Sequence, residues 1–185
     1  MSEETRKSPV VVSVINLKGG VGKTTVAALF ARYAARMNLN VLAVDLDPQA
    51  NLSQALMTER DYQQFMESRE ASIVELFNGY LPPSPERSAP APLENVLKKV
   101  GSRRKENFHL IPSRFDFADN LISRVSVDEH VLAKFISDEM GDKDLILIDC
   151  APTESVLTRT AYHASRYVLV PVKTEFFSTI GFPLL

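Results

Sequence analysis

The sequence lacks the features that mark secreted and membrane proteins. Its 185 residues contain one cysteine, Cys150, which excludes an internal disulfide framework and a four-cysteine metal site within one chain. Met1 to Ser8 are polar and charged, without the apolar core of a signal peptide. No uninterrupted apolar run approaches the length that crosses a bilayer. We therefore expect a cytoplasmic protein without stable membrane insertion.

An excess of charge of one sign is also lacking. The formal net charge is -2, which gives no overall attraction to nucleic acid or to anionic lipid, so binding to either needs a local patch. The basic cluster around Gly101 is the candidate for contact with DNA phosphates. A solvated turn is the favoured interpretation of such a cluster. Its members are Lys98, Lys99, Arg103, Arg104 and Lys105.

Apolar runs alternate with helical patterns along the chain. Pro9–Asn16, Asn40–Asp47 and Leu145–Asp149 are almost continuously apolar, which is typical of strands buried on both faces of a parallel sheet. Shorter strands are expected at 108–112 and 167–172. The alternation predicts an α/β fold, a three-layer α/β/α sandwich around a mainly parallel, twisted sheet with right-handed crossovers.

The first helix follows the first strand, with Val26, Leu29, Phe30 and Tyr33 at helical spacing. Further helices are expected at 53–57, 61–67, 72–77, 93–100, 127–140 and 153–165. Five prolines between residues 80 and 92 exclude a helix there and predict an exposed loop. We therefore expect a disordered tail at 1–8 and one domain over 9–185, interrupted by this proline-rich loop.

The glycine-rich run LKGGVGKTT lies between the first strand and the first helix. Glycines let successive backbone N–H groups form a nest for phosphate oxygens, and the helix directs its positive dipole end at the same charge. Lys23 is placed to neutralise the β- and γ-phosphates, the Thr24 hydroxyl to bind Mg²⁺, and Thr25 to bond to the α-phosphate. A plain turn with a surface lysine is the alternative, which the strand–loop–helix context disfavours. The run predicts a P-loop NTPase that binds ATP and Mg²⁺ through a nucleotide-binding stretch of seven residues: Gly19, Gly20, Val21, Gly22, Lys23, Thr24 and Thr25.

Acidic residues end two of the buried strands. Asp45 and Asp47 close the second strand in VDLDPQ, and strand periodicity places both on one face. Asp149 ends LILID, a Walker B arrangement in which a buried strand delivers a carboxylate to the metal. Cys150 follows it and is interpreted as a small buried residue rather than a nucleophile, because no histidine lies close in sequence.

The run from Lys18 to Thr25 resembles the deviant P-loop of the ParA/MinD family, with the pattern KGG-x-GK-T-T, and the partition ATPases of the ParA/Soj type above all. The D-x-D-P-Q segment that contains Asp45 and Asp47, the Walker B strand and PVKTEFF follow in the family's order. The resemblance implies that Lys18 crosses a homodimer interface to the partner's ATP. It also implies that Asp47 positions the attacking water, while Asp45 supports the magnesium shell with Thr24 and Asp149. Gln49 and Asn51 are further candidates for hydrogen bonds to the nucleotide.

The resemblance implies a slow ATPase that dimerises on ATP and partitions plasmids or chromosomes through nonspecific DNA binding, with a ParB-like activator as partner. A MinD-like switch at a membrane or protein partner and a vestigial ATP-binding module are the alternatives. An iron–sulfur reductase would need two cluster cysteines per subunit, and the lone Cys150 argues against this alternative. Family members continue for several more elements, so we expect the region over 9–185 to be C-terminally incomplete.

Overall fold

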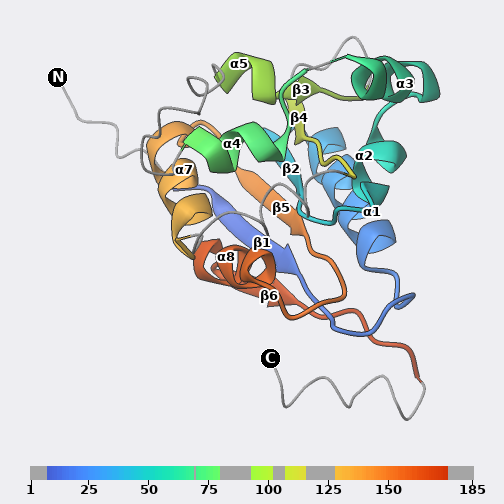
Figure 1. Ribbon diagram of the computed structural model, residues 1–185. Helices are drawn as coiled ribbons and strands as arrows, with labels where there is room; N and C mark the ends of the chain where they lie inside the picture. The colour runs from blue at the N-terminus through green and yellow to red at the C-terminus, as the bar shows by residue number, and fades with distance from the viewer. Residues whose placement is uncertain (1–7, 69, 80–92, 102–106, 116–127, 175–185) are drawn as a thin grey trace, which may run out of the picture.

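The computed structural model describes residues 8–68, 70–79, 93–101, 107–115 and 128–174 (Figure 1). The tail expected at 1–8, apart from Ser8, lies outside these residues. The same holds for the proline-rich loop at 80–92, for the basic residues 103–105 and for the PVKTEFF segment beyond Thr174.

Six strands form a single sheet in the order β3-β4-β2-β5-β1-β6. Their bounds are β1 Val10–Val14, β2 Val41–Asp45, β3 Lys98–Lys99, β4 Phe108–Ile111, β5 Leu145–Asp149 and β6 Tyr167–Leu169. All neighbours pair in parallel except β3 and β4, which confirms the mainly parallel sheet. Because β5 pairs with both β1 and β2, the carboxyl ends of three central strands meet at one edge of the sheet.

Helices cover both faces of the sheet, so the fold is the expected three-layer sandwich (Figure 1). On one face pack α1 Lys23–Arg36 and α2 Asn51–Leu56, and on the other α4 Ile73–Gly79, α7 Val131–Glu139 and α8 Val156–Ala164. Two further helices, α3 Glu59–Glu67 and α5 Leu93–Val96, lie beside the β3 end of the sheet (Figure 1). Within the described ranges no helix is both long and apolar enough to cross a bilayer.

The buried face of α1 differs from the one that its large side chains indicate. Leu29 and Tyr33 are more than 60% exposed, whereas the face against the sheet consists of alanines. These are Ala27, Ala28, Ala31, Ala34 and Ala35. Alanine combines the highest helix propensity with the smallest side chain that has a Cβ, so α1 packs its backbone close to the strands.

The helix expected at 93–100 is wrong in its second half. Lys98–Lys99 forms β3 and pairs antiparallel with β4, and the Val100 N–H donates to the Phe108 carbonyl at 3.0 Å. Pairing with a strand that lies eight or more residues further along the chain outweighs the local helical preference of this segment.

Candidate nucleotide-binding site

The glycine-rich loop joins the end of β1 to the start of α1 and opens onto a cavity of about 460 Å³. Gly20 and Gly22 have φ values of 71° and 92°, a left-handed conformation that glycine adopts without strain. A Cβ placed on Gly19, Gly20 or Gly22 would meet no heavy atom within 4 Å. The backbone of the loop is therefore accessible to a ligand. The cavity is lined by Gly19, Gly20, Gly22, Lys23, Thr24, Thr25, Asp47, Gln49, Asn51 and Pro152.

Lys23 is the cation of this cavity. Its side chain is buried, and its Nζ donates to the Lys18 carbonyl at 3.2 Å. Burial lowers the pKa of the Lys23 ammonium, and the negative charges of Asp149 and Asp47 oppose that shift. The ammonium therefore bonds to its own loop and faces carboxylates, and phosphate oxygens can take the place of the carbonyl.

Lys18 and Val21 belong to the loop but do not line the cavity. The Lys18 N–H donates to the Asn16 Oδ1 at 2.8 Å, and the Asn16 Nδ2 donates to the Pro171 carbonyl at 2.9 Å. Val21 is buried beneath the loop. Sequence reasoning missed Asn16, the polar residue that ends the predicted first strand and ties the loop to the segment after β6.

Asp47 reaches the cavity from the segment after β2. It is 7% exposed, and its Oδ1 accepts the Gln49 N–H at 2.9 Å. This bond holds the carboxylate on the same side of the turn as Gln49 and Asn51, which also line the cavity. The structure thus brings together the P-loop and the three polar residues that the sequence indicated after the second strand.

Asp149 ends β5 between β1 and β2, and its side chain is fully buried. Neither carboxylate oxygen makes a hydrogen bond of ordinary geometry with the described residues. Burial raises its pKa to about 6; the Thr24 hydroxyl and the Lys23 ammonium lower it, whereas the Asp47 carboxylate raises it. A buried carboxylate without donors, close to a threonine hydroxyl, fits the oxygen-rich environment of a hydrated Mg²⁺ ion.

Asp45 lies directly beside Asp149 in the register of β2 and β5, but its environment differs. Its Oδ1 accepts the Asp47 N–H at 3.1 Å, and its Oδ2 accepts the Ser53 N–H at 2.8 Å and the Ser53 hydroxyl at 2.7 Å. Burial is the main cause that raises its pKa to about 7, and the Ser53 hydroxyl opposes the shift. Neither Asp45 nor Asp149 is among the residues that line the cavity, and support of a metal by Asp45 stays a prediction.

A family model described as an AAA domain matches residues 10–185. The chromosome-partitioning ATPase Soj of Thermus thermophilus is 32% identical over 170 residues, which cover 92% of this chain and 57% of Soj. The chain belongs to the ParA/MinD family of P-loop ATPases. It spans little more than half of the length of this ParA/Soj-type relative.

Solved structures of the ParA/MinD fold agree with this assignment. A structure of pNOB8 ParA bound to nonspecific DNA superposes with a TM-score of 0.75 at 26% identity, covering 95% of this chain and 57% of that one. The cobyrinic acid a,c-diamide synthase of Mycobacterium smegmatis, solved with a bound ATP analog and magnesium, gives a TM-score of 0.73 at 29% identity. That match covers 95% of this chain and 66% of the synthase chain.

Cys150 of this ParA/MinD-family chain is fully buried behind the site, and burial raises the pKa of its thiol well above the ordinary value. A thiol of this kind is a poor nucleophile, because reaction proceeds through the thiolate. This supports the interpretation of Cys150 as a packing residue.

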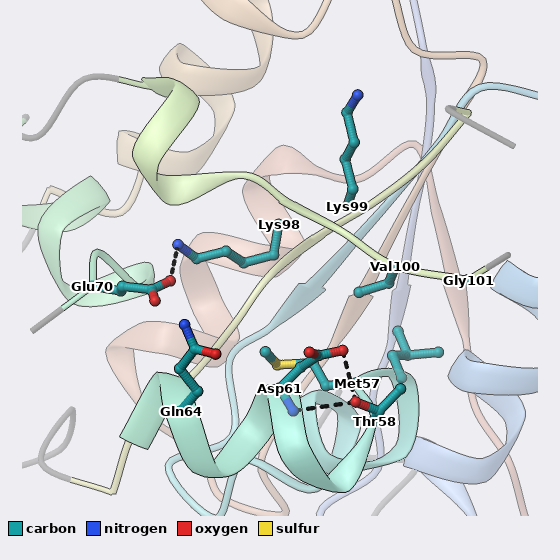
Figure 2. A pocket seen from close by; sticks show the side chains of 10 residues that line it. Met57, Thr58, Asp61, Gln64, Glu70, Lys98, Lys99, Val100 and Gly101 are labelled. Carbon is teal, nitrogen blue, oxygen red and sulfur yellow. Dashed lines mark hydrogen bonds and ion pairs between the residues drawn. The ribbon is translucent and has the colours of Figure 1, made fainter. Parts of the chain in front are cut away.

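A second cavity of about 230 Å³ lies between α3 and the segment formed by β3 and the residues that follow it (Figure 2). Lys98 extends toward Glu70, with 2.6 Å between its Nζ and the Glu70 Oε2, whereas Lys99 points to the opposite side of the strand (Figure 2). The charge of Lys98 is therefore compensated within the chain. The P-loop and the acidic strand ends do not contribute to the lining of this cavity.

Proposed function

We propose that this protein binds Mg-ATP, dimerises on binding it and hydrolyses it slowly. We also propose that it works in the cytoplasm in plasmid or chromosome partitioning through nonspecific DNA binding, with a ParB-like activator. The observation that carries the nucleotide part is the buried carboxylate of Asp149, whose oxygens make no hydrogen bond of ordinary geometry with the described residues, beside Thr24 and Lys23 of the open P-loop. The similarity to the chromosome-partitioning ATPase Soj and to pNOB8 ParA bound to nonspecific DNA supports the partition part.

The chemistry proposed is transfer of the γ-phosphoryl group to water. Backbone N–H groups of the loop and the Lys23 ammonium bind the phosphate oxygens and stabilise the charge that develops on them. Thr24 and Asp149 would hold Mg²⁺, and the ion would supply charge neutralisation at the phosphates. Asp47 orients the attacking water, since it is the carboxylate that lines the cavity.

Lys18 is proposed to reach the ATP of a second subunit. Two lysines on one loop repel each other until triphosphate supplies negative charge, so ATP would favour the dimer. Sedimentation with a non-hydrolysable ATP analogue tests this. Lys18→Ala should bind the analogue with nearly unchanged affinity and remain monomeric, and dimerisation equal to that of the parent would remove Lys18 from the interface.

Calorimetry with Mg-ATP tests the proposed function as a whole. The parent should release binding heat, and Lys23→Ala should lose roughly tenfold or more in affinity because a charge-assisted contact is removed. Lys134→Ala is the matched control, since Lys134 is an exposed lysine of α7 that pairs with Asp128. A folded parent that shows no heat with Mg-ATP would contradict the proposal.

DNA binding measured with and without ATP, over a series of salt concentrations, tests the partition role. A steep fall of affinity with salt, seen only with ATP, supports contacts to phosphates. ATP binding without DNA binding would shift the assignment to a MinD-like spatial regulator or to an ATP-binding module without partition activity.

A further inference from the structure

We propose that Ser53 is a positioning residue that acts through Asp45: together they clamp the segment from Asp47 to Asn51 at the edge of the nucleotide cavity. This inference rests on the proposed function, because the segment it holds carries the carboxylate assigned to the attacking water. It gives Asp45 a role in holding the protein chain, in contrast to the metal support that the resemblance implies.

The clamp consists of hydrogen bonds that close a loop of the chain. Asp45 lies at the end of β2, and Ser53 lies in the first turn of α2. The Asp45 Oδ2 accepts both the N–H and the hydroxyl of Ser53, and the Oδ1 accepts the Asp47 N–H. One carboxylate therefore fixes both ends of the turn that presents Asp47, Gln49 and Asn51 to the cavity.

Ser53 also ties this turn to the next strand. Its Oγ accepts the N–H of Ser113, just beyond β4, at 3.0 Å. Asp45, Ser53 and Ser113 are all fully buried. This hydroxyl donates to one buried group and accepts from another. Its removal leaves the buried Ser113 N–H without its acceptor and takes one of two hydrogen bonds from the Asp45 Oδ2, which keeps the bond from the Ser53 N–H.

The clamped turn contains a backbone conformation that needs support. Ala50 has φ 54° and ψ 31°, the left-handed region in which a Cβ is unfavourable. Its N–H donates to the backbone carbonyl of Asp47 at 2.8 Å, so the turn closes at the residue whose carboxylate lines the cavity. Such a conformation persists only where the surrounding contacts enforce it. Loosening the clamp should therefore let Asp47 move away from the phosphates.

Asp149, at the end of the neighbouring strand, differs from Asp45 in having carboxylate oxygens that are available to a metal. Asp149 lies opposite Asp45 in the sheet, and both of its oxygens lack hydrogen bonds within the described part of the chain. Both oxygens of Asp45 already accept hydrogen bonds from its own segment. The two buried acids thus separate into one whose oxygens hold the chain and one whose oxygens are left available beside Thr24 and Lys23 of the P-loop.

Steady-state ATP turnover and binding of a fluorescent Mg-ATP analogue, measured on the same proteins, test the role of Ser53. Ser53→Ala should lower kcat roughly tenfold or more, because small misplacements of a catalytic group are costly, while the Kd of the analogue changes less than about threefold. Ser53→Thr should restore most of kcat. Ser113→Ala is the matched control, because its hydroxyl makes no hydrogen bond with the described residues and its N–H is retained, and kcat should be unchanged.

A titration of Mg²⁺ with the same fluorescent analogue tests the role of Asp45. Asp45→Asn should leave the Mg²⁺ midpoint within about twofold of the parent, whereas Asp149→Asn should raise it by about tenfold or more. If Asp45→Asn moves the midpoint as far as Asp149→Asn does, Asp45 supports the metal and the inference is overturned. An unchanged kcat in Ser53→Ala overturns it as well.

The outcomes separate this inference from the proposed function. A parent that does not bind the analogue contradicts the proposed function, whereas a parent that binds and turns over ATP but is indifferent to Ser53 contradicts the clamp alone. If Ser53→Ala does not fold, as judged by circular dichroism, the near-isosteric Ser53→Cys takes its place with the same expectations. Parent-like turnover in Ser53→Cys, whose thiol is only a weak donor and acceptor, would then count against the clamp.

Discussion

Two aspartates at the same level of the sheet show that the surroundings of a carboxylate determine what it can bind. Asp45 and Asp149 are both fully buried at the ends of adjacent strands, and burial is the main cause that raises the pKa of each. Their hydrogen bonds distinguish them, since Asp45 accepts three and Asp149 none from the described residues. The identity of the residue alone therefore does not tell which carboxylate serves a cation.

The raised pKa values predict a pH dependence of stability in the absence of Mg²⁺. A carboxyl whose pKa rises from 3.8 in the unfolded chain to about 6 or about 7 in the folded protein stabilises the fold below pH 4. That contribution is lost as the pH rises through 6 and 7, by up to about 1.4 kcal/mol per pH unit for each group. Between about pH 5 and pH 8 in EDTA, the free energy of unfolding should therefore fall.

Asp149→Asn isolates one of the two groups, because the amide stays neutral at every pH. Over the same range the variant should lose on the order of 1–2 kcal/mol less than the parent, measured by urea unfolding at each pH. Asp128→Asn is the control, since this exposed carboxyl has its pKa lowered by the hydrogen bond from Lys134. Identical slopes for the parent and Asp149→Asn would show that Asp149 does not carry this dependence.

The elements that carry the phosphate site could be predicted, because their signals are local. The run LKGGVGKTT follows β1 and includes the first turn of α1, as its pattern requires, and the three long apolar runs are the central strands. The sequence did not predict β3, because its pairing with β4 is not local. The helix α1 was predicted, but its packed face of five small alanines was not, because alanine gives a weak hydrophobic pattern. Ser53 was missed as a functional residue because its role depends on Asp45 and Ser113, which only the fold brings together.

Arg114 connects α3 to the end of β4. No pattern in the sequence predicts this contact. Its Nη2 donates to the carbonyls of Phe65, Ser68 and Glu70 at 2.7, 2.9 and 3.0 Å, and its guanidinium lies 4.3 Å from the centre of the Phe65 ring. The carbonyls at a helix end lack intrahelical partners, so a cation there satisfies them.

Arg114→Ala should destabilise the protein by about 2–3 kcal/mol, because it removes charged hydrogen bonds and a cation–π contact. Amide exchange in α3 should accelerate, while the Kd of Mg-ATP stays within about twofold, since α3 does not line the nucleotide cavity. Arg60→Ala, an exposed arginine on the same helix, should change neither property. Exchange in α3 that is equally slow in Arg114→Ala would mean that other contacts hold this helix.

At the scale of the whole molecule, the order of strands places the site. The connection from β1 through α1 to β2 runs in one direction along the sheet, and the connection from β5 through α8 to β6 runs in the other. Ligands of open α/β sheets bind where this direction reverses, at the carboxyl ends of the strands. Here the reversal lies at β1 and β5, which explains why residues more than 100 positions apart, such as Thr24 and Asp149, lie close together.

Because the site joins these two halves of the sheet, binding of Mg-ATP should stabilise the entire fold. Mg-ATP at a hundred times its Kd should add about 2.7 kcal/mol, which corresponds to a rise in Tm of roughly 5–10 °C for a domain of this size. In Asp149→Asn, most of the difference in Tm between melts with Mg-ATP and melts with ATP and EDTA should disappear. Mg²⁺ alone at the same concentration should have little effect on the Tm. Thermal melts of the two proteins under these three conditions measure the coupling directly. An equal gain from ATP with and without Mg²⁺ in the parent would mean that the triphosphate binds through the P-loop alone, and that the buried carboxylate at the end of β5 faces no metal.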